Sequence, residues 1–230
     1  AIFWHNQGVK RIVLARELSL KEINEIRCHL PESCEIEAFV HGSMCMSYSG
    51  RCVLSNYMTG RDANRGQCAQ PCRYKYYLME EKRQGEYFPV FEDDRGAYIL
   101  NSKDLCMVEH IPELVKSGIN SLKIEGRMKS SYYVATVVKA YRRAIDAYFE
   151  NPDSYKFKKV WLDDLMKASH RVYYTGFYFG DPDRQIYETS SYIRNYDIVG
   201  IVKDYDSLEE RVVIEQRNKV LNEDEVEVLR

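Results

Sequence analysis

Near the start of the chain, the spacing of hydrophobic residues changes from that of a strand to that of a helix and back. Residues 8–18 (GVKRIVLAREL) are rich in β-branched residues and predict a strand. Residues 19–30 (SLKEINEIRCHL) have apolar residues at helical spacing, and Ser19 with Glu22 forms a capping box. Residues 34–42 (CEIEAFVHG) predict a second strand. A strand–helix–strand unit favours parallel pairing of its strands.

A second copy of this pattern lies further along the chain. Residues 118–124 (GINSLKI) repeat the arrangement of residues 8–14 (GVKRIVL), in which a glycine ends a helix and a strand runs out to charged residues. The charged residues at the two strand ends are Arg16, Glu17, Glu125 and Arg127. Further predicted elements are a strand in residues 97–105 (AYILNSKDL) that ends at Asn101, a helix at 110–118, and a long amphipathic helix at 130–151.

Repeated strand–helix units with polar residues at the carboxyl ends of the strands are typical of a (β/α) barrel, whose chemistry lies at that face. The chain supplies only about four such units, half of the eight in a closed barrel. We therefore expect an α/β fold in which residues 1–185 form the C-terminal half of a TIM-type barrel with a cysteine-rich insertion at 42–77. On this interpretation, the N-terminal half is absent or is supplied by another chain.

The pattern changes again after about residue 190. Residues 197–205, 210–217 and 225–230 show the period of two that is typical of short, half-exposed strands. We expect residues 186–230 to form the start of a small antiparallel β-barrel module. Because the pattern stops in the middle of a strand at Arg230, we expect this module to be incomplete.

Composition restricts the classes of protein to consider. The chain has 230 residues, of which 45% are hydrophobic, and its net charge of −2 does not by itself indicate a nucleic-acid-binding protein. Its apolar runs are much shorter than a bilayer span, and no secretory leader opens it, so we expect a cytoplasmic protein without a membrane segment. The seven cysteines are clustered rather than spread, which favours thiols or metal ligands over a disulfide framework.

The cysteines of residues 42–72 are spaced C-x6-C-x15-C-x3-C, and another follows at the end of a predicted strand. Thiolate sulfur is the preferred ligand of iron–sulfur clusters and of zinc. We favour a four-iron four-sulfur cluster over zinc, because only one pair of cysteines has the tight spacing of a zinc knuckle. The candidate ligands are Cys45, Cys52, Cys68, Cys72 and Cys106. Spacing does not decide which four bind, and buried thiols without a metal remain the alternative.

Residues 37–55 (EAFVHGSMCMSYSGRCVLS) resemble the signature of the collagenase-like U-32 peptidase family. The residues that agree with its fixed positions are Glu37, Phe39, Gly42, Ser43, Met44, Cys45, Gly50, Cys52, Leu54 and Ser55. The resemblance continues through NRGQCAQPCRYKY, LNSKDLCM, LKIEGRMKS and TGFYFGDP, and IEQRNKVLNEDEVEV is similar to the family's C-terminal β-barrel module. The resemblance implies a four-iron four-sulfur cluster on Cys45, Cys52, Cys68 and Cys106, with Cys72 as the substitute fourth ligand.

Family members differ in the activity that they imply for this chain. Some are labelled proteases, whereas others hydroxylate an RNA base, including the wobble uridine of tRNA with prephenate as a required metabolite. Others act as cluster-bearing partner subunits. The resemblance therefore implies tRNA and prephenate as partners of an iron–sulfur hydroxylase, and a related subunit or a homo-oligomer is a further possibility. The site in this chain can also be empty or hold zinc.

The candidate catalytic groups lie at the predicted strand ends. The chain contains neither the H-E-x-x-H nor the G-x-S-x-G pattern of hydrolases. His41 is the plausible catalytic imidazole, either paired with a cysteine nucleophile in a protease or, as the simpler reading, hydrogen-bonded near the cluster. Glu125 and Arg127 end the second repeat, and the arginine is suited to bind a carboxylate or phosphate. The alternative for Arg127 is an inter-strand ion pair with Glu17 or Glu37.

Residues 51–77 are strongly basic in a chain that is otherwise nearly neutral. Their only acid is Asp62, and aromatic residues are interleaved with the cations. Phosphate-binding cations next to stacking aromatics are the features that bind single-stranded RNA. The candidate RNA-binding residues are Arg51, Arg61, Arg65, Arg73, Tyr74 and Lys75. The structural alternative is a solvated loop whose tyrosines pack against the barrel.

Overall fold

A computed structural model describes residues 1–45, 47–74, 77–78, 84–85, 88–89, 103–180 and 192–229. Its strands are β1 (Arg11–Val13), β2 (Glu35–Ser43), β3 (Tyr77–Leu78), β4 (Phe88–Pro89), β5 (Asp104–Cys106), β6 (Ser121–Ile124), β7 (Tyr173–Tyr174), β8 (Gly200–Asp206) and β9 (Arg211–Gln216). Its α-helices are α1 (Ile2–Asn6), α2 (Leu20–His29), α3 (Leu54–Thr59), α4 (Ile111–Lys116), α5 (Ser131–Glu150) and α6 (Lys159–Lys167). Short 3-10 turns are η1 (Ala63–Arg65), η2 (Pro71–Arg73), η3 (Val108–His110) and η4 (Pro152–Ser154).

The main sheet is organised around β2, which pairs in parallel with both β1 and β6. The predicted strand–helix–strand unit is thus confirmed as β1–α2–β2, and the two sequence repeats supply the two parallel neighbours of β2. The capping box that predicted α2 is also present, because Ser19 Oγ accepts a hydrogen bond from the Glu22 amide and the Glu22 side chain accepts one from the Ser19 amide. Parallel pairing brings the carboxyl ends of β1, β2 and β6 to the same edge.

One expectation about the sheet needs correction. β5 pairs antiparallel with β2, so the described strands form an open mixed sheet rather than the all-parallel arrangement of a half TIM-type barrel. The long connection at residues 44–103 leaves the end of β2 at Ser43 and returns beside it at Asp104, so β5 runs back along β2. The strand predicted to end at Asn101 lies outside the described residues.

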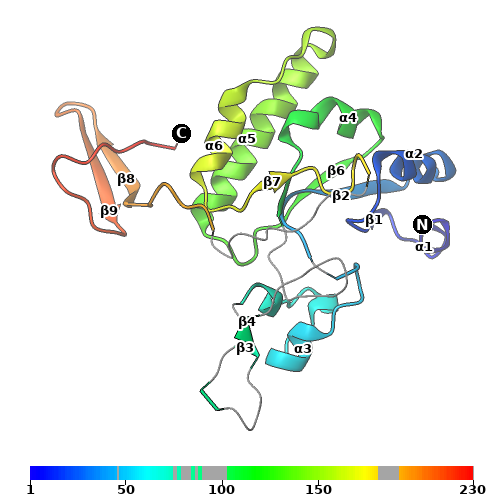
Figure 1. Ribbon diagram of the computed structural model, residues 1–230. Helices are drawn as coiled ribbons and strands as arrows, with labels where there is room; N and C mark the ends of the chain where they lie inside the picture. Colours follow the sequence, from blue (N-terminus) through cyan, green and yellow to red (C-terminus); the bar gives the residue numbers. More distant parts are fainter. Residues whose placement is uncertain are drawn as a thin grey trace.

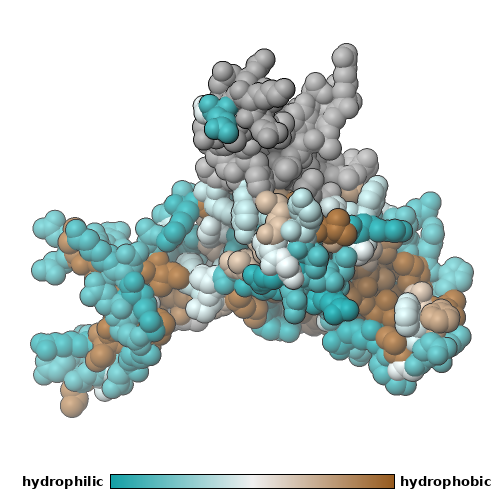
Figure 2. Space-filling view, turned by 90° about the horizontal axis from the view of Figure 1, so that it is seen from below, coloured by the Kyte–Doolittle hydropathy of each residue, from teal (hydrophilic) through white to brown (hydrophobic). Residues whose placement is uncertain are grey.

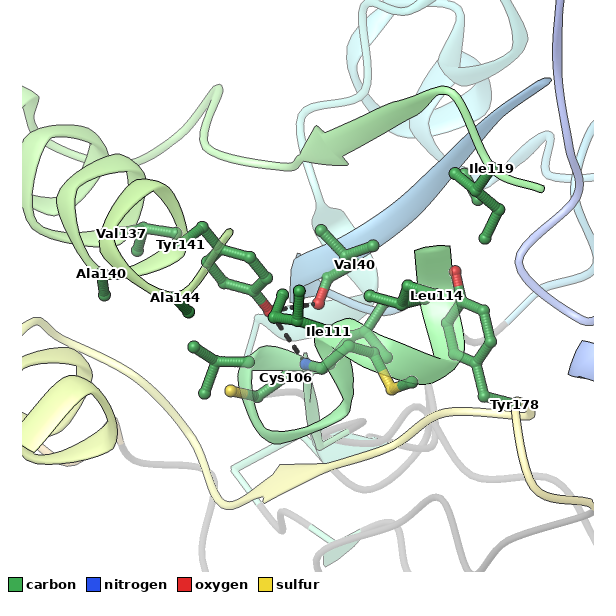
Figure 3. Close-up of a cluster of buried hydrophobic side chains, with 14 of the residues drawn as sticks. Val40, Cys106, Ile111, Leu114, Ile119, Val137, Ala140, Tyr141, Ala144 and Tyr178 are labelled. Carbon is green, nitrogen blue, oxygen red and sulfur yellow. Dashed lines mark hydrogen bonds between the residues drawn. The ribbon is translucent and has the colours of Figure 1, made fainter. Parts of the chain in front are cut away.

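The core lies between β2 and the helices α4 and α5. Alternate residues of β2 are buried, with Ile36 and Val40 fully enclosed. On α5, buried side chains recur at helical spacing. The helix contacts α4 and α6, and Figure 1 shows α5 and α6 running side by side. Burying each such aliphatic side chain contributes about 1.5–3 kcal/mol to folding. Figure 3 shows Val40 of β2, Ile111 and Leu114 of α4 and a row of α5 residues meeting in this core.

The C-terminal segment is a β8–β9 hairpin that extends from the body of the molecule (Figure 1). The hairpin confirms two of the three predicted strands. The third was wrong over residues 225–229, which are described and are not in a strand. At the opposite end of the molecule, where α1 and α2 lie, Figure 2 shows hydrophobic surface. Ile2, Phe3 and Trp4 of α1 are exposed. No α-helix in the described ranges is long and apolar enough to cross a bilayer.

Candidate functional site

The carboxyl ends of β1, β2 and β6 are joined by specific contacts. Arg16, which follows β1, donates a hydrogen bond from Nη1 to the backbone oxygen of Ser43 at 2.9 Å. The Glu125 amide donates to the backbone oxygen of His41 at 2.9 Å. Gly42 has a φ of +109°, and a Cβ at this position would overlap the backbone oxygen of Glu125. The strands therefore come so close here that only glycine fits.

Cys45 follows the end of β2, and Cys52 and Cys68 lie near enough to affect its pKa; we call these three residues the cysteine trio. Cys45 is an exposed residue, but the protein around its thiol raises the pKa of that thiol by desolvation. The Ser47 amide and Arg16 act in the opposite direction, whereas negative charge on Cys52 and Cys68 raises the Cys45 pKa further. The three thiols are therefore close enough to interact electrostatically, although 15 residues separate the last two along the chain.

Hydrogen bonds shape the loop that carries the trio. The Gln70 amide donates to the Cys68 sulfur at 3.2 Å, and the Ala69 amide donates to the hydroxyl of Ser55 at 3.0 Å. Asn64 donates from Nδ2 to the backbone oxygen of Cys52 at 3.2 Å. These contacts hold the segment around Cys68 against α3, so the loop has a defined shape before any ligand is considered.

The remaining candidate ligands lie in different surroundings. Cys106 is buried on β5, where the Tyr141 hydroxyl contacts its thiol and burial raises its pKa to about 12. Figure 3 shows it among the core side chains. Cys72 is partly buried in η2. Within the described residues, no group of three or more His, Cys, Asp or Glu side chains is arranged to hold a metal ion.

His41 lies in an aromatic environment near the end of β2 rather than at the surface. Its ring is 1% exposed and lies 5.3–6.0 Å, centre to centre, from the rings of Tyr133, Tyr141 and Tyr173. Burial, together with Lys129 and His170, lowers its pKa to about 3, so the imidazole is neutral. Its Nδ1 lies 3.5 Å from the hydroxyl of Tyr141, which donates to the backbone oxygen of Val40 at 2.7 Å (Figure 3).

Glu125 and Arg127 form a turn that reaches the cysteine-rich loop. The Arg127 amide donates to Glu125 Oε1 at 3.0 Å, and Arg127 Nη2 lies 3.4 Å from the position that a Cβ on Gly66 would take. Arg127 therefore borders the loop two residues before Cys68. The alternative ion pairs are not formed within the described residues: Glu37 binds Ser121, Lys123 and Arg11, and Glu17 accepts the Ser49 amide at 2.6 Å.

The basic segment is exposed next to the trio. Arg51, Arg61 and Arg65 are at the surface, and Arg65 has a weak ion pair with Asp62 at 3.7 Å. Tyr74 is half exposed and donates from its hydroxyl to the backbone oxygen of Ala69 at 3.3 Å. For Arg73 the structure describes the backbone in η2, and Lys75 lies outside the described residues.

Arg16 was placed at a strand end from the sequence but was not chosen there as a candidate site residue. Its guanidinium lies 4.2 Å from the ring centre of Phe39, bonds the backbone of Ser43 and lowers the pKa of Cys45. Parallel pairing puts the end of β1 next to the end of β2, and this step would have selected Arg16. The same step would have selected Glu17, which binds the cysteine-rich loop through Ser49.

Comparison with known proteins identifies the family. The model of peptidase family U32 matches residues 1–188, and that of the peptidase family U32 C-terminal domain matches residues 194–230. The chain belongs to peptidase family U32. The resemblance of the signature at 37–55 is thus confirmed over nearly the whole chain.

Several U32 relatives are curated. tRNA hydroxylation protein P1 of Bacillus subtilis is 45% identical, over 98% of this chain and 53% of its own length. tRNA hydroxylation protein P of Escherichia coli is 41% identical, over 76% of this chain and 46% of its own. The uncharacterized protease MJ0090 of Methanocaldococcus jannaschii is 41% identical, over 94% and 51% respectively. This U32 chain thus spans about half the length of the curated relatives it matches, and no solved structure matches it.

Proposed function

We propose that this chain carries the iron–sulfur centre and part of the RNA-binding surface of an enzyme that hydroxylates the wobble uridine of tRNA. The observation that carries the proposal is that Cys45, which follows β2 beside Arg16, lies near enough to Cys52 and Cys68 for both to affect its pKa. Similarity to proteins named for tRNA hydroxylation supports RNA as the substrate. Because those relatives are about twice as long, we expect the complete activity from the full-length protein.

The donor atoms of the trio suit an iron–sulfur cluster, since thiolates are its usual ligands. Cys45, Cys52 and Cys68 would each bind one iron, and Cys106 or Cys72 would supply the fourth thiolate. When bound, the cluster supplies one-electron transfer at this edge of the sheet. Because the described side chains do not form a ready metal-binding group, cluster binding would be coupled to rearrangement of the loop. Zinc is the alternative occupant of the same thiolates.

The chain's own residues would prepare this edge for an anionic substrate. Arg16 favours the thiolate form of Cys45, as its effect on that pKa indicates. Arg127 lies beside the same loop with its guanidinium outside any described ion pair, and a guanidinium can bind a carboxylate or phosphate through two hydrogen bonds. A dicarboxylate such as prephenate, or an RNA phosphate, fits this position. Glu125 holds the Arg127 backbone in place.

The proposed assembly is a half (β/α) barrel that a further part of the full-length protein, a related subunit or a second copy completes. The parallel pairing of β2 with β1 and β6 supports this proposal. An enzyme that meets tRNA and prephenate would work in the cytoplasm.

The geometry disfavours proteolysis by a cysteine–histidine pair. Such a protease needs its imidazole within hydrogen-bond reach of the nucleophilic thiol. His41 is instead enclosed by tyrosines, with its Nδ1 directed to Tyr141, and it is neutral throughout the physiological pH range. His41 would support the end of β2, and Tyr141 would fix its orientation.

The test measures the centre and the activity separately in the full-length protein. Anaerobically purified protein should contain iron and labile sulfide, and a strain lacking its own wobble-uridine hydroxylases should regain 5-hydroxyuridine when the protein is expressed. Cys45→Ser should lower iron content and abolish the nucleoside, whereas Cys28→Ser, an exposed cysteine on α2, should change neither. Iron-free protein that cleaves gelatin, with tRNA unmodified, would overturn the proposal in favour of a protease.

A further inference from the structure

An exposed apolar face on α3 lies within the basic segment and has no role in holding the cysteine loop. Tyr57 is 89% exposed and Val53, which precedes the helix, is 71% exposed. Residues four apart lie on the same face of a helix, so the two side chains form one surface. The opposite face of α3 is anchored by Ser55, which is fully buried and accepts the Ala69 amide.

Arginines lie close to α3 in the chain and in the fold. α3 ends at Gly60 in the left-handed conformation, and Arg61 follows immediately. α3 contacts η1, which carries Arg65 with a side chain that is 83% exposed. In residues 47–74 four arginines stand against one aspartate. An exposed tyrosine can stack on a flat base of a single-stranded nucleic acid, and nearby arginines can bind its anionic backbone.

The position of α3 leaves the face accessible. α3 belongs to the segment that extends from the main sheet on the side away from α5 and α6 (Figure 1). An aromatic ring that contributed to the core of this segment would be buried, and burial would stabilise it by about 2 kcal/mol. The near-complete exposure of Tyr57 therefore shows that its ring is not needed for the core and is available for binding.

We propose that Tyr57, with Val53 beside it, is a stacking platform for an unpaired RNA base, and that Arg61 and Arg65 bind the adjoining phosphates. The inference rests on the proposed function and adds a specificity: the chain binds an unstacked, single-stranded segment in preference to a duplex. Stacking acts on the base and is insensitive to salt, whereas phosphate contacts release counterions and weaken steeply with salt. The two contributions can therefore be measured independently.

The experiment measures binding of a short fluorescent oligouridine by anisotropy over a range of salt concentrations. An RNA duplex of equal length and inorganic polyphosphate are measured in the same way, as competitors that displace the probe. Tyr57→Ala should weaken oligouridine binding about tenfold, leave polyphosphate binding unchanged and keep the salt dependence of the wild type. Tyr57→Phe should restore the affinity. Arg61→Ala should instead weaken all three ligands and reduce the salt dependence. Tyr205→Ala, which removes an exposed tyrosine of β8, is the matched control and should change nothing.

Each other outcome counts against the inference. If wild-type protein and Tyr57→Ala bind oligouridine equally well, Tyr57 is not a stacking platform, although the chain still binds RNA. If Tyr57→Ala changes self-association in sedimentation instead of RNA affinity, the face binds a second copy of the chain. If wild-type protein binds neither RNA, both this inference and the proposed function fail. Because Tyr57 is so exposed, its replacement leaves the fold intact, and circular dichroism checks this.

Discussion

Gly42 shows how a single residue sets the geometry of the strand ends. Its φ of +109° is open to glycine, and a methyl group there would overlap the Glu125 backbone. We expect Gly42→Ala to lower the free energy of unfolding by roughly 3 kcal/mol, because strain and overlap add. Urea denaturation measures the change. Gly50→Ala is the control: its φ of +75° brings strain without a neighbour within 4 Å, so the loss should be about 1 kcal/mol. Equal losses would show that the close approach to Glu125 carries no cost.

Thr136 has a buried hydroxyl group that makes no hydrogen bond within the described residues. It is 1% exposed on α5, and its Oγ1 has no hydrogen-bond partner within the described residues. Thr136→Val keeps the shape and removes the desolvation cost, so we expect the free energy of unfolding to rise by about 1 kcal/mol. Ser117→Ala is the control with the opposite expectation. Ser117 is equally buried, but its hydroxyl donates a hydrogen bond to the Leu114 oxygen at 2.7 Å. Its replacement should therefore lower the free energy of unfolding by about 1 kcal/mol. A stability loss in Thr136→Val would indicate a hydrogen bond that this geometry does not contain.

At the scale of elements, Glu37 links the central strand to both parallel neighbours. It accepts hydrogen bonds from Lys123 and Ser121 on β6, each at 2.9 Å, and lies 3.6 Å from Arg11 of β1. The Lys123 hydrogen bond in particular holds the Glu37 pKa below its ordinary value of 4.5. The ionised carboxylate therefore stabilises the fold above about pH 4.5, and this stability is lost as the pH falls through the lower, folded-state pKa.

The corresponding prediction concerns acid unfolding. The glutamine side chain in Glu37→Gln cannot ionise. The free energy of unfolding of this variant should therefore fall less steeply than that of the wild type as the pH drops from about 5 to about 3. Urea midpoints across this range measure the slope. Glu32→Gln, which removes an exposed carboxylate outside the sheet, should retain the wild-type slope. A Glu37→Gln slope identical to that of the wild type would mean that the link to β6 does not depend on charge.

The elements that sequence predicted well are those determined by local signals. α2 has its capping box, and β1, β2 and β6 follow from β-branched runs that end in charged residues. The antiparallel pairing of β5 was not predictable, because a strand of three residues carries no signal for its partner. The environment of Cys106 was missed for the same reason: all three residues of β5 are buried, so spacing could not tell which side its thiol faces.

At the scale of the candidate site, parallel topology predicted more than residue spacing did. Polar residues at the ends of parallel strands must meet, and this brings Arg16, Cys45 and Arg127 to the same edge. The burial of His41 was not predictable, because its sequence position beside Gly42 is compatible with either side of the strand. Its surroundings come from Tyr133 and Tyr141, about a hundred residues away on α5.

At the scale of the whole molecule, the body and the β8–β9 hairpin have different sources of stability. The body has a continuous core around β2, whereas the hairpin exposes apolar residues along both strands, including Val202, Val213 and Ile214. Figure 2 shows brown hydrophobic surface scattered over this lobe. A hairpin without a packed face is only marginally stable in water. Its described links to the body include the ion pair of Lys167 with Glu227 at 2.7 Å and the bridge between His170 and Ile193.

We therefore expect the hairpin to open independently of the body in this 230-residue chain. Native-state hydrogen exchange should find the amides of β8 and β9 exchanging at least about a hundredfold faster than that of the Val40 region, a difference of roughly 3 kcal/mol in opening free energy. Repeating the measurement at several protein concentrations separates the alternatives. Protection equal to that of β2 at every concentration would show that the hairpin folds cooperatively with the core. Protection that rises with concentration would show that a second copy covers the exposed apolar residues, and the isolated hairpin would then be the state of the monomer.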